Sequence, residues 1–277
     1  MALFPSDALA GGSVILMIGD GMGWGQVKCR DGLLAAQTPS AWVITNEVNG
    51  WTTDSAAAAT AYSCGIKTRN GYLAMTPDGQ KCETLAQKAK ARGYGAIVAT
   101  TEGPTGATPA AFYAHSFDRN DHEDIRAQLL KTPVKVIGDM SPQAEFELLP
   151  IPAAVSFGGQ YTCMMDGRKP FFMMIEEAYI DKESHANNLA GMLVRMTDFE
   201  KAIASAMKFT EANPDVTLVV TADHETGGLD PLTCAFTTGD HTAANVPLYA
   251  YGAKAHMFSG IMENTEVSKA IGEILFD

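Results

Sequence analysis

The chain has 277 residues, 46% of them hydrophobic, and a formal net charge of −12. This length and composition allow a large core, and we expect one domain over residues 1–277. The acidic balance argues against a protein that binds a nucleic-acid backbone or an anionic membrane, since both need clustered Lys and Arg, and no stretch is apolar enough to span a bilayer.

Short apolar runs rich in β-branched residues alternate with segments of helical pattern. The predicted strands are 13–18, 96–100, 134–137, 171–175, 216–221 and 247–251. The predicted helices are 56–64, 83–92, 122–131, 187–210 and 267–275. Apolar strands separated by helices imply an α/β fold, a three-layer α/β/α sandwich with a mostly parallel central sheet. In such sheets, ligands bind beyond the carboxyl ends of the strands.

The stretch 140–168 is the least regular part of the chain. Three prolines and a pair of glycines punctuate it, and no long apolar run crosses it. We expect a loop-rich connection there, with room for one short strand.

Asp20 ends the first predicted strand within a glycine-rich turn, VILMIGDGMGWG. A dinucleotide-binding loop is the obvious competitor, but the glycine spacing is wrong and a carboxylate inside the loop would repel a pyrophosphate. Ser55 follows Asp54 and opens an alanine-rich helix, where a hydroxyl lies at the positive end of the helix dipole. Taken alone, each of these positions is also typical of a helix cap.

Three histidines each stand beside a carboxylate at the end of a predicted strand. Asp181 and His185 are four residues apart where a strand gives way to a helix, and with His241 they form a three-ligand zinc site with an open fourth position. The second site consists of Asp20, Asp223, His224 and the Ser55 oxygen. Two zinc ions would activate Ser55 and then water. The remaining histidines, His115, His122 and His256, are interpreted as structural or surface residues.

The motifs together resemble those of bacterial alkaline phosphatases, in the same order and over nearly the whole chain. They are the Gly-Asp-Gly turn at 19–21, TDSAAAATA at 53–61, ATPAAFYAH at 107–115, IDKESHANN at 180–188, TADHETGG at 221–228 and GDHT at 239–242. The resemblance implies a phosphate monoester hydrolase that forms a phosphoserine at Ser55. It implies small phosphate esters as substrates and a periplasmic or secreted location, although the N-terminus shows no signal peptide. It leaves a homodimer open as the assembly.

The same resemblance implies further site residues. Asp20, Thr108 and Glu176 would bind one Mg²⁺ beside the two Zn²⁺, because oxygen ligands suit a hard cation. Arg119 would clamp the phosphate with its planar guanidinium, and Lys182 would also contact substrate.

Three departures from the family pattern stand out. Gly106 occupies a position where relatives have an Asp or His that supports magnesium, so we expect weakened magnesium binding. Glu177 replaces a glycine and competes with Glu176 for the ligand role, with spacing to Asp181 favouring Glu176. The interval from Arg119 to Glu176 is short, which indicates a reduced version of the fold.

Two other functions stay open from the sequence. A phosphodiesterase or nucleotide pyrophosphatase would share the two-zinc core, but Thr108, Glu176 and Arg119 argue against it. A catalytically impaired protein that only binds metal or phosphate is the other alternative.

The cysteines leave the redox compartment undecided. They are Cys29, Cys64, Cys82, Cys163 and Cys234. Their odd number and the lack of CxxC spacing leave at least one thiol unpaired within the chain, and indicate neither a full disulfide framework nor a zinc knuckle.

Overall fold

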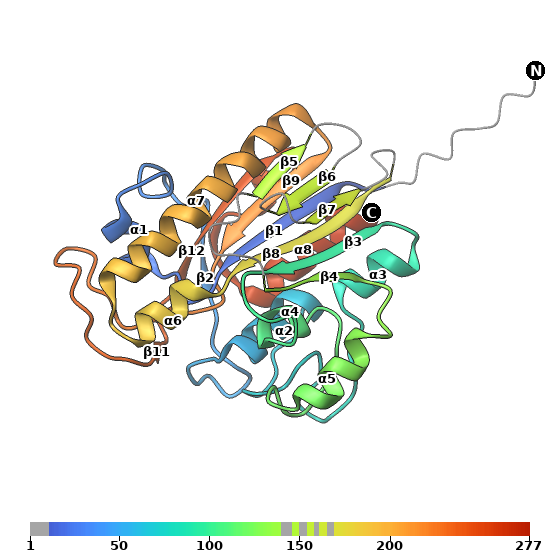
Figure 1. Cartoon of the computed structure of the whole chain (residues 1–277), viewed down its shortest axis with the longest axis horizontal. Coiled ribbons are helices and arrows are strands. Elements are labelled where there is room, and N and C mark those ends of the chain that lie inside the picture. The colour runs from blue at the N-terminus through green and yellow to red at the C-terminus, as the bar shows by residue number, and fades with distance from the viewer. Residues whose placement is uncertain (1–10, 140–145, 150–153, 158–160, 165–168) are drawn as a thin grey trace, which may run out of the picture.

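The computed structural model of the chain describes residues 11–139, 146–149, 154–157, 161–164 and 169–277 (Figure 1). An eight-stranded sheet forms its centre. In order across the sheet, the strands are β13 (Gly260–Glu263), β2 (Ala41–Ile44), β12 (Val246–Gly252), β9 (Val216–Thr221), β1 (Ser13–Gly19), β8 (Phe171–Glu177), β3 (Gly95–Thr100) and β4 (Lys135–Ile137). Strand β12 is antiparallel to both neighbours, and every other neighbouring pair is parallel.

Helices cover both faces of this sheet, which gives the predicted three layers (Figure 1). One face carries α1 (Trp24–Arg30), α6 (Tyr179–His185) and α7 (Leu189–Ala212). The other carries α2 (Ser55–Cys64), α3 (Leu85–Ala91), α4 (Ala107–Ala110), α5 (His122–Leu129) and α8 (Asn264–Phe276). A 3₁₀ turn, η1 (Ala255–Met257), follows β12. Within the described ranges, no helix is both long and apolar enough to cross a membrane.

The central strand β1 determines where the site lies. All seven of its residues are buried, because parallel neighbours and helices enclose it on every side. In the register of the sheet, Ile18 lies beside Glu176 on β8 and Thr221 on β9. The carboxyl ends of these three strands therefore coincide, and the polar residues that follow them meet at one edge.

All six strands predicted from the sequence are present, with their ends shifted by two residues or fewer. Strands β2 and β13 were not predicted, since each has only four residues and lies toward one edge of the sheet. A two-stranded ribbon of β10 (Glu225–Thr226) and β11 (His241–Thr242) was also not predicted.

The expectation of at most one short strand within 140–168 was wrong. An antiparallel sheet of β5 (Phe146–Leu149), β6 (Ala154–Phe157) and β7 (Tyr161–Met164) lies there, with β5 against α7. Pro150, Pro152 and the glycine pair lie between these strands in the sequence, and residues of these types are typical of hairpin turns. The remaining residues of this stretch lie outside the described ranges.

The burial of the central strand predicts how much the free energy of unfolding falls when a core side chain is shortened. Leu16 on β1 is fully buried, so Leu16→Ala should lower the free energy of unfolding by about 2–5 kcal/mol. Val194 on α7 is 56% exposed, and Val194→Ala should change it by less than about 0.5 kcal/mol. Denaturant titration of both variants checks this, and equal effects would contradict the assignment of β1 to the core.

Candidate active site

The predicted site residues lie at the carboxyl edge of the sheet. Asp20 directly follows β1, and Asp223 and His224 follow β9. Glu176 is the penultimate residue of β8, and the short helix α6 after β8 carries Asp181. Strand ends that are adjacent in the sheet thus bring together residues that are distant in sequence.

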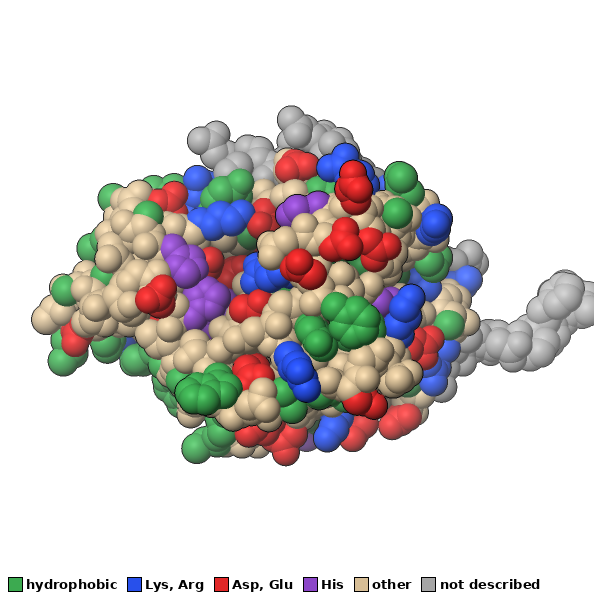
Figure 2. All heavy atoms as spheres, turned by 90° about the horizontal axis from the view of Figure 1, so that it is seen from below, with side chains coloured by type: hydrophobic (Ala, Val, Ile, Leu, Met, Phe, Trp, Pro, Cys, Tyr) green, Lys and Arg blue, Asp and Glu red, His purple; other side chains and the backbone are tan. Residues whose placement is uncertain are grey.

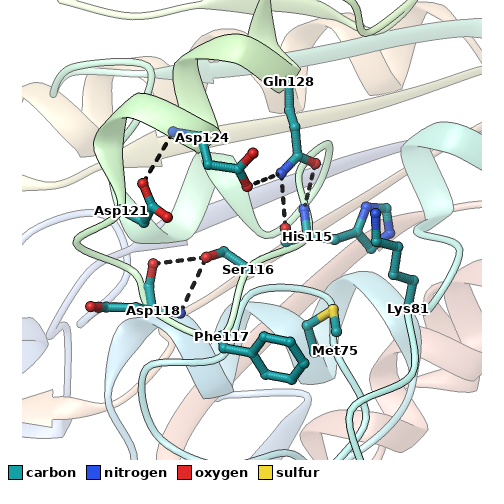
Figure 3. Close-up of a pocket in the computed structure, with 9 residues that line it drawn as sticks. All are labelled: Met75, Lys81, His115, Ser116, Phe117, Asp118, Asp121, Asp124 and Gln128. Atoms are coloured by element: carbon teal, nitrogen blue, oxygen red, sulfur yellow. Dashed lines mark hydrogen bonds between the residues drawn. The ribbon is translucent and has the colours of Figure 1, made fainter.

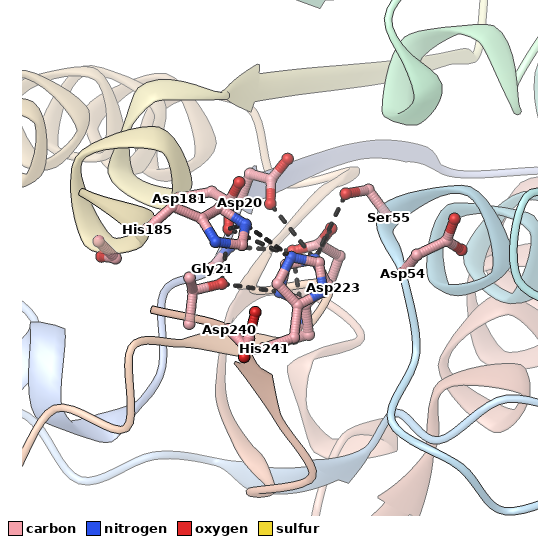
Figure 4. Close-up of polar contacts among 12 residues, drawn as sticks. Asp20, Gly21, Asp54, Ser55, Asp181, His185, Asp223, Asp240 and His241 are labelled. Atoms are coloured by element: carbon pink, nitrogen blue, oxygen red, sulfur yellow. Dashed lines mark hydrogen bonds and ion pairs between the residues drawn. The ribbon is translucent and has the colours of Figure 1, made fainter. Parts of the chain in front are cut away.

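The inner group consists of Asp20, Asp223 and His224, all buried, with the Ser55 hydroxyl facing them (Figure 4). His224 Nε2 lies 3.3 Å from Ser55 Oγ, 3.2 Å from Asp223 Oδ2 and 3.6 Å from Asp20 Oδ1. Asp223 Oδ1 accepts hydrogen bonds from the backbone N–H groups of Gly21 and His224. Asp223 Oδ2 and Asp20 Oδ1 are buried and have no hydrogen-bond donor.

The outer group consists of Asp181, His185 and His241. The Nε2 atoms of the two histidines are 3.0 Å apart, and Asp181 Oδ1 lies 3.4 Å from the first and 3.6 Å from the second. The His241 ring also stacks on the His224 ring with centroids 3.6 Å apart, so the two groups adjoin. Histidine, acidic and basic side chains gather on the corresponding face of the molecule (Figure 2).

The other ring nitrogen of each histidine has its own partner. His185 Nδ1 lies 2.6 Å from the carbonyl of Gly239, and His241 Nδ1 lies 3.0 Å from the carbonyl of Thr53. A carbonyl only accepts, so both Nδ1 atoms carry the proton and both Nε2 atoms are left with a lone pair. This orientation is typical of histidines that bind metal.

Thr226 connects the two groups. Its hydroxyl donates to Asp181 Oδ1 at 2.5 Å and lies 3.2 Å from His224 Nδ1. The Thr226 oxygen therefore accepts a hydrogen bond from the Nδ1–H group of His224 while its hydroxyl proton is donated to the Asp181 carboxylate. The sequence analysis did not single out Thr226, although it belongs to the quoted motif at 221–228.

Burial and the repulsion between carboxylates make the charged state of the inner group energetically unfavourable by itself. Burial raises the pKa of Asp20, and the neighbouring carboxylates, first Asp223 and then Asp181, raise it further. Burial also lowers the pKa of His224, so its imidazole is neutral near pH 7. Converging carboxylates, neutral imidazoles and unpartnered buried oxygens are what a divalent cation would neutralise and satisfy.

A third group, made only of oxygens, lies behind Asp20. Thr108 Oγ1 in α4 and Glu176 Oε1 are buried and have no hydrogen-bond partner, while Glu176 Oε2 accepts from the hydroxyl of Thr100. Burial and the charge of Glu102 raise the pKa of Glu176. Glu177 makes different contacts: its carboxylate accepts from Thr101 Oγ1 at 3.3 Å and from the Tyr179 backbone at 3.0 Å.

Ser55 is the first residue of α2, and Asp54 is the N-cap of that helix. Asp54 Oδ1 accepts from the backbone of Ala57, and Asp54 Oδ2 accepts from Gly71 at 2.9 Å and from Arg119 Nη1 at 3.2 Å. One carboxylate thus starts the helix that presents Ser55 and positions the guanidinium of Arg119. From the sequence, Asp54 was interpreted only as the neighbour of Ser55 and as a helix cap.

Lys182 projects from α6 into an ion pair. Its Nζ donates to Glu102 Oε2 at 2.8 Å and lies 4.5 Å from the centre of the Tyr179 ring. The expected contact with substrate would therefore compete with, or extend, this pair. Glu102 was missed in the sequence analysis, because nothing in its local motif distinguishes it from a surface acid.

The three histidines outside these groups are His115, His122 and His256. His122 and His256 are exposed, and His115 lines a separate pocket of 430 Å³ with Asp124 and Gln128 (Figure 3). There the Gln128 amide bonds both the N–H and the carbonyl of His115, and it also donates to Asp124. These polar groups satisfy one another, unlike those of the cluster around Ser55.

A disulfide joins two of the cysteines across the fold. Cys29 in α1 is bonded to Cys234, with a Cα–Cα distance of 5.6 Å. Cys234 lies in the loop 227–240 between β10 and β11, and His241 directly follows this loop. Among the residues whose side chains are described, Cys64 and Cys82 are free thiols.

The hydroxyl of Thr226 provides a test of the two groups as metal ligands. Thr226→Val keeps the shape of this buried side chain but removes the contacts to Asp181 and His224. Zinc affinity, measured by competition with a chelating dye, should fall by about 10–100-fold. Thr265→Val in α8 is the matched control and should leave it unchanged. Unchanged affinity in Thr226→Val would contradict the ligand assignment.

Comparisons with known proteins identify the family of the chain. The family model described as Alkaline phosphatase matches residues 12–159, 162–234 and 231–276. Alkaline phosphatase 3 of Bacillus subtilis (strain 168) is 25% identical over 355 aligned positions, which cover 80% of this chain and 77% of that protein. The alignment is longer than this chain of 277 residues, so the relative contains inserted segments.

Solved structures give the same result. The alkaline phosphatase from the Antarctic bacterium TAB5 superposes with a TM-score of 0.81 at 26% identity, covering 95% of this chain and 98% of that one. A variant of the TAB5 enzyme, with a histidine replaced by glutamate and magnesium bound in its M3 site, gives a TM-score of 0.82 at 26% identity, with the same coverage. The chain therefore belongs to the alkaline phosphatase family of phosphate monoester hydrolases.

Proposed function

We propose that this protein hydrolyses phosphate monoesters with Ser55 as the nucleophile, through a phosphoserine intermediate. The observation that carries the proposal is the position of Ser55 Oγ, 3.3 Å from His224 Nε2 and at the edge of two adjoining groups of metal-ligand residues. His224 faces Ser55 with Nε2, but its other nitrogen, Nδ1, lies 3.2 Å from the hydroxyl of Thr226, where the histidine of a serine protease would have a carboxylate partner.

We assign the ligands by their donor chemistry. Asp181, His185 and His241 would hold one Zn²⁺, and the inner group would hold another, because nitrogen and carboxylate donors suit zinc. Asp20, Thr108 and Glu176 offer only oxygens and would hold Mg²⁺. When bound, these ions supply Lewis acidity that lowers the pKa of a hydroxyl or of water beside the phosphate.

The chain's own residues bind and orient the ester. Arg119, held by the N-cap residue Asp54 of α2, would offer a charged planar donor that suits two phosphate oxygens. The positive end of the α2 dipole favours the same anion. Lys182, 45% exposed in its side chain, would add a positive charge at the rim.

We extend the proposal to the context of the enzyme. The substrates are small phosphate esters, and the chain forms a single domain over residues 1–277. Family membership and the Cys29–Cys234 disulfide both support a periplasmic or secreted location, since disulfides persist in oxidising compartments. A homodimer stays a prediction, which sedimentation of the purified protein would test.

Replacement of the nucleophile is the direct test. Ser55→Ala should lower the release of inorganic phosphate from a monoester by about 10³-fold or more, while the zinc content stays near that of the unmodified protein. Ser63→Ala, which removes a buried hydroxyl from the same helix, is the control and should retain most of the activity. Full turnover in Ser55→Ala would end the serine mechanism.

Arg119 separates a monoesterase from a diesterase. A phosphate monoester has one more non-bridging oxygen and one more negative charge than a diester, and a guanidinium binds these charged oxygens, so Arg119→Ala should lower kcat/KM for a monoester by about 10–100-fold. The exposed Arg126→Ala in α5 is the control. A preference for diesters that Arg119→Ala leaves untouched would favour a phosphodiesterase, and bound metal without any turnover would favour a binding protein.

A further inference from the structure

The space beside Gly106 is filled from elsewhere in the chain. Gly106 is the N-cap of α4 and has no side chain with which to support the oxygen group at Thr108. A Cβ atom built on Gly106 would lie 1.8 Å from Glu102 Oε1 and 2.3 Å from Glu102 Cδ. The carboxylate of Glu102 therefore occupies the place where a side chain at position 106 would begin.

The backbone of Glu102 is fixed on both sides. Its N–H donates to Thr100 Oγ1 at 3.1 Å, and the same hydroxyl donates to the carboxylate of Glu176. Its carbonyl accepts from the backbone of Asp139 at 2.6 Å. The position of Glu102 is thus coupled to the Glu176 carboxylate through a single intervening residue.

Glu102 faces the oxygen group with one of its two carboxylate oxygens. Glu102 Oε1 is the atom nearest to the Cβ position of Gly106, the N-cap of the helix that carries Thr108. Lys182 Nζ donates to Glu102 Oε2 at 2.8 Å, which leaves the other carboxylate oxygen on the side of Gly106. The side chain of Glu102 is only 18% exposed.

The neighbouring groups indicate what the carboxylate faces. Thr108 Oγ1, Glu176 Oε1 and Asp20 Oδ1 are all buried and have no hydrogen-bond partner. Lys182 bonds the outer side of Glu102, and among the described residues it makes no hydrogen bond to these three oxygens. Acceptor oxygens and negative charge in this arrangement suit a hard divalent cation.

We propose that Glu102 replaces, through space, the side chain that position 106 lacks, and that it is the positioning carboxylate of the cation site formed by Asp20, Thr108 and Glu176. Lys182 holds it in place. The inference rests on the third ion of the proposed function, and it predicts magnesium binding in spite of Gly106. One acidic residue four positions upstream thus compensates for the departure at Gly106.

The first test measures Mg²⁺ binding to the zinc-loaded enzyme by titration calorimetry. Glu102→Gln keeps the shape of the side chain and removes its charge, and it should weaken Mg²⁺ binding by about 10–100-fold with zinc content unchanged. Glu123→Gln in α5, an exposed acid, is the matched control and should bind Mg²⁺ like the unmodified protein.

A rescue variant excludes a merely structural role. Glu102→Ala should lose Mg²⁺ affinity and should also free the space at position 106. Gly106 has φ −59°, which any residue adopts, so Gly106→Asp in the Glu102→Ala background should restore Mg²⁺ affinity. Gly106→Asp alone should do less, because the two carboxylates would collide.

The outcomes distinguish this inference from the proposed function. Unchanged Mg²⁺ affinity in Glu102→Gln, or loss of zinc together with magnesium, would overturn the role of Glu102 while leaving Ser55 as the nucleophile. Absence of any Mg²⁺ binding in the unmodified zinc-loaded enzyme would remove the third ion itself and the inference with it. Failure of the Gly106→Asp rescue would also overturn the replacement through space.

Discussion

The structure depends on the crowding of negative charge at one edge of the sheet. Parallel strands that end together force Asp20, Glu176 and Asp223 into a buried region where burial raises the pKa of all three, and where the charge of Asp223 further raises the pKa values of Asp20 and Glu176. Such a cluster is stable only when its charge is neutralised, and side chains of the opposite sign, Arg119 and Lys182, lie at its margin. The apolar core of β1 and its neighbours resists this repulsion and holds the carboxylates in place.

Hydrogen bonds outside the ligand set convert this crowding into a defined geometry. Carbonyls of Thr53 and Gly239 orient two imidazoles, and the hydroxyl of Thr226 connects the third to Asp181. Asp54 performs a similar role for Ser55 and Arg119. None of these partners belongs to the proposed ligand or substrate-binding residues, yet each restricts one of those residues, which is how buried polar networks confer precision.

The sequence predicted the layers of the fold, the long strands and the residues that meet at their ends, because β-branched runs and adjacent Asp and His side chains are local signals. It could not predict the role of Glu102 or Thr226, since their importance comes from contacts across 80 and 45 residues of chain. It also underestimated the strands within 140–168, where short segments between turn residues carry little periodic signal. The pairing of Cys29 with Cys234 could not be predicted from their spacing either, because the two cysteines are 205 residues apart in the sequence.

The Cys29–Cys234 disulfide affects the entropy of the outer group. The loop 227–240 is long for a connection between two paired strands, and a free chain of this length would sample many positions for the residue at its end. Attachment of its middle to α1 divides it into two shorter segments, and so restricts the positions open to His241, which also pairs with Thr226 in the ribbon. Part of the entropy cost of ordering this imidazole is therefore met when the disulfide forms, and would not weaken the binding of an ion there.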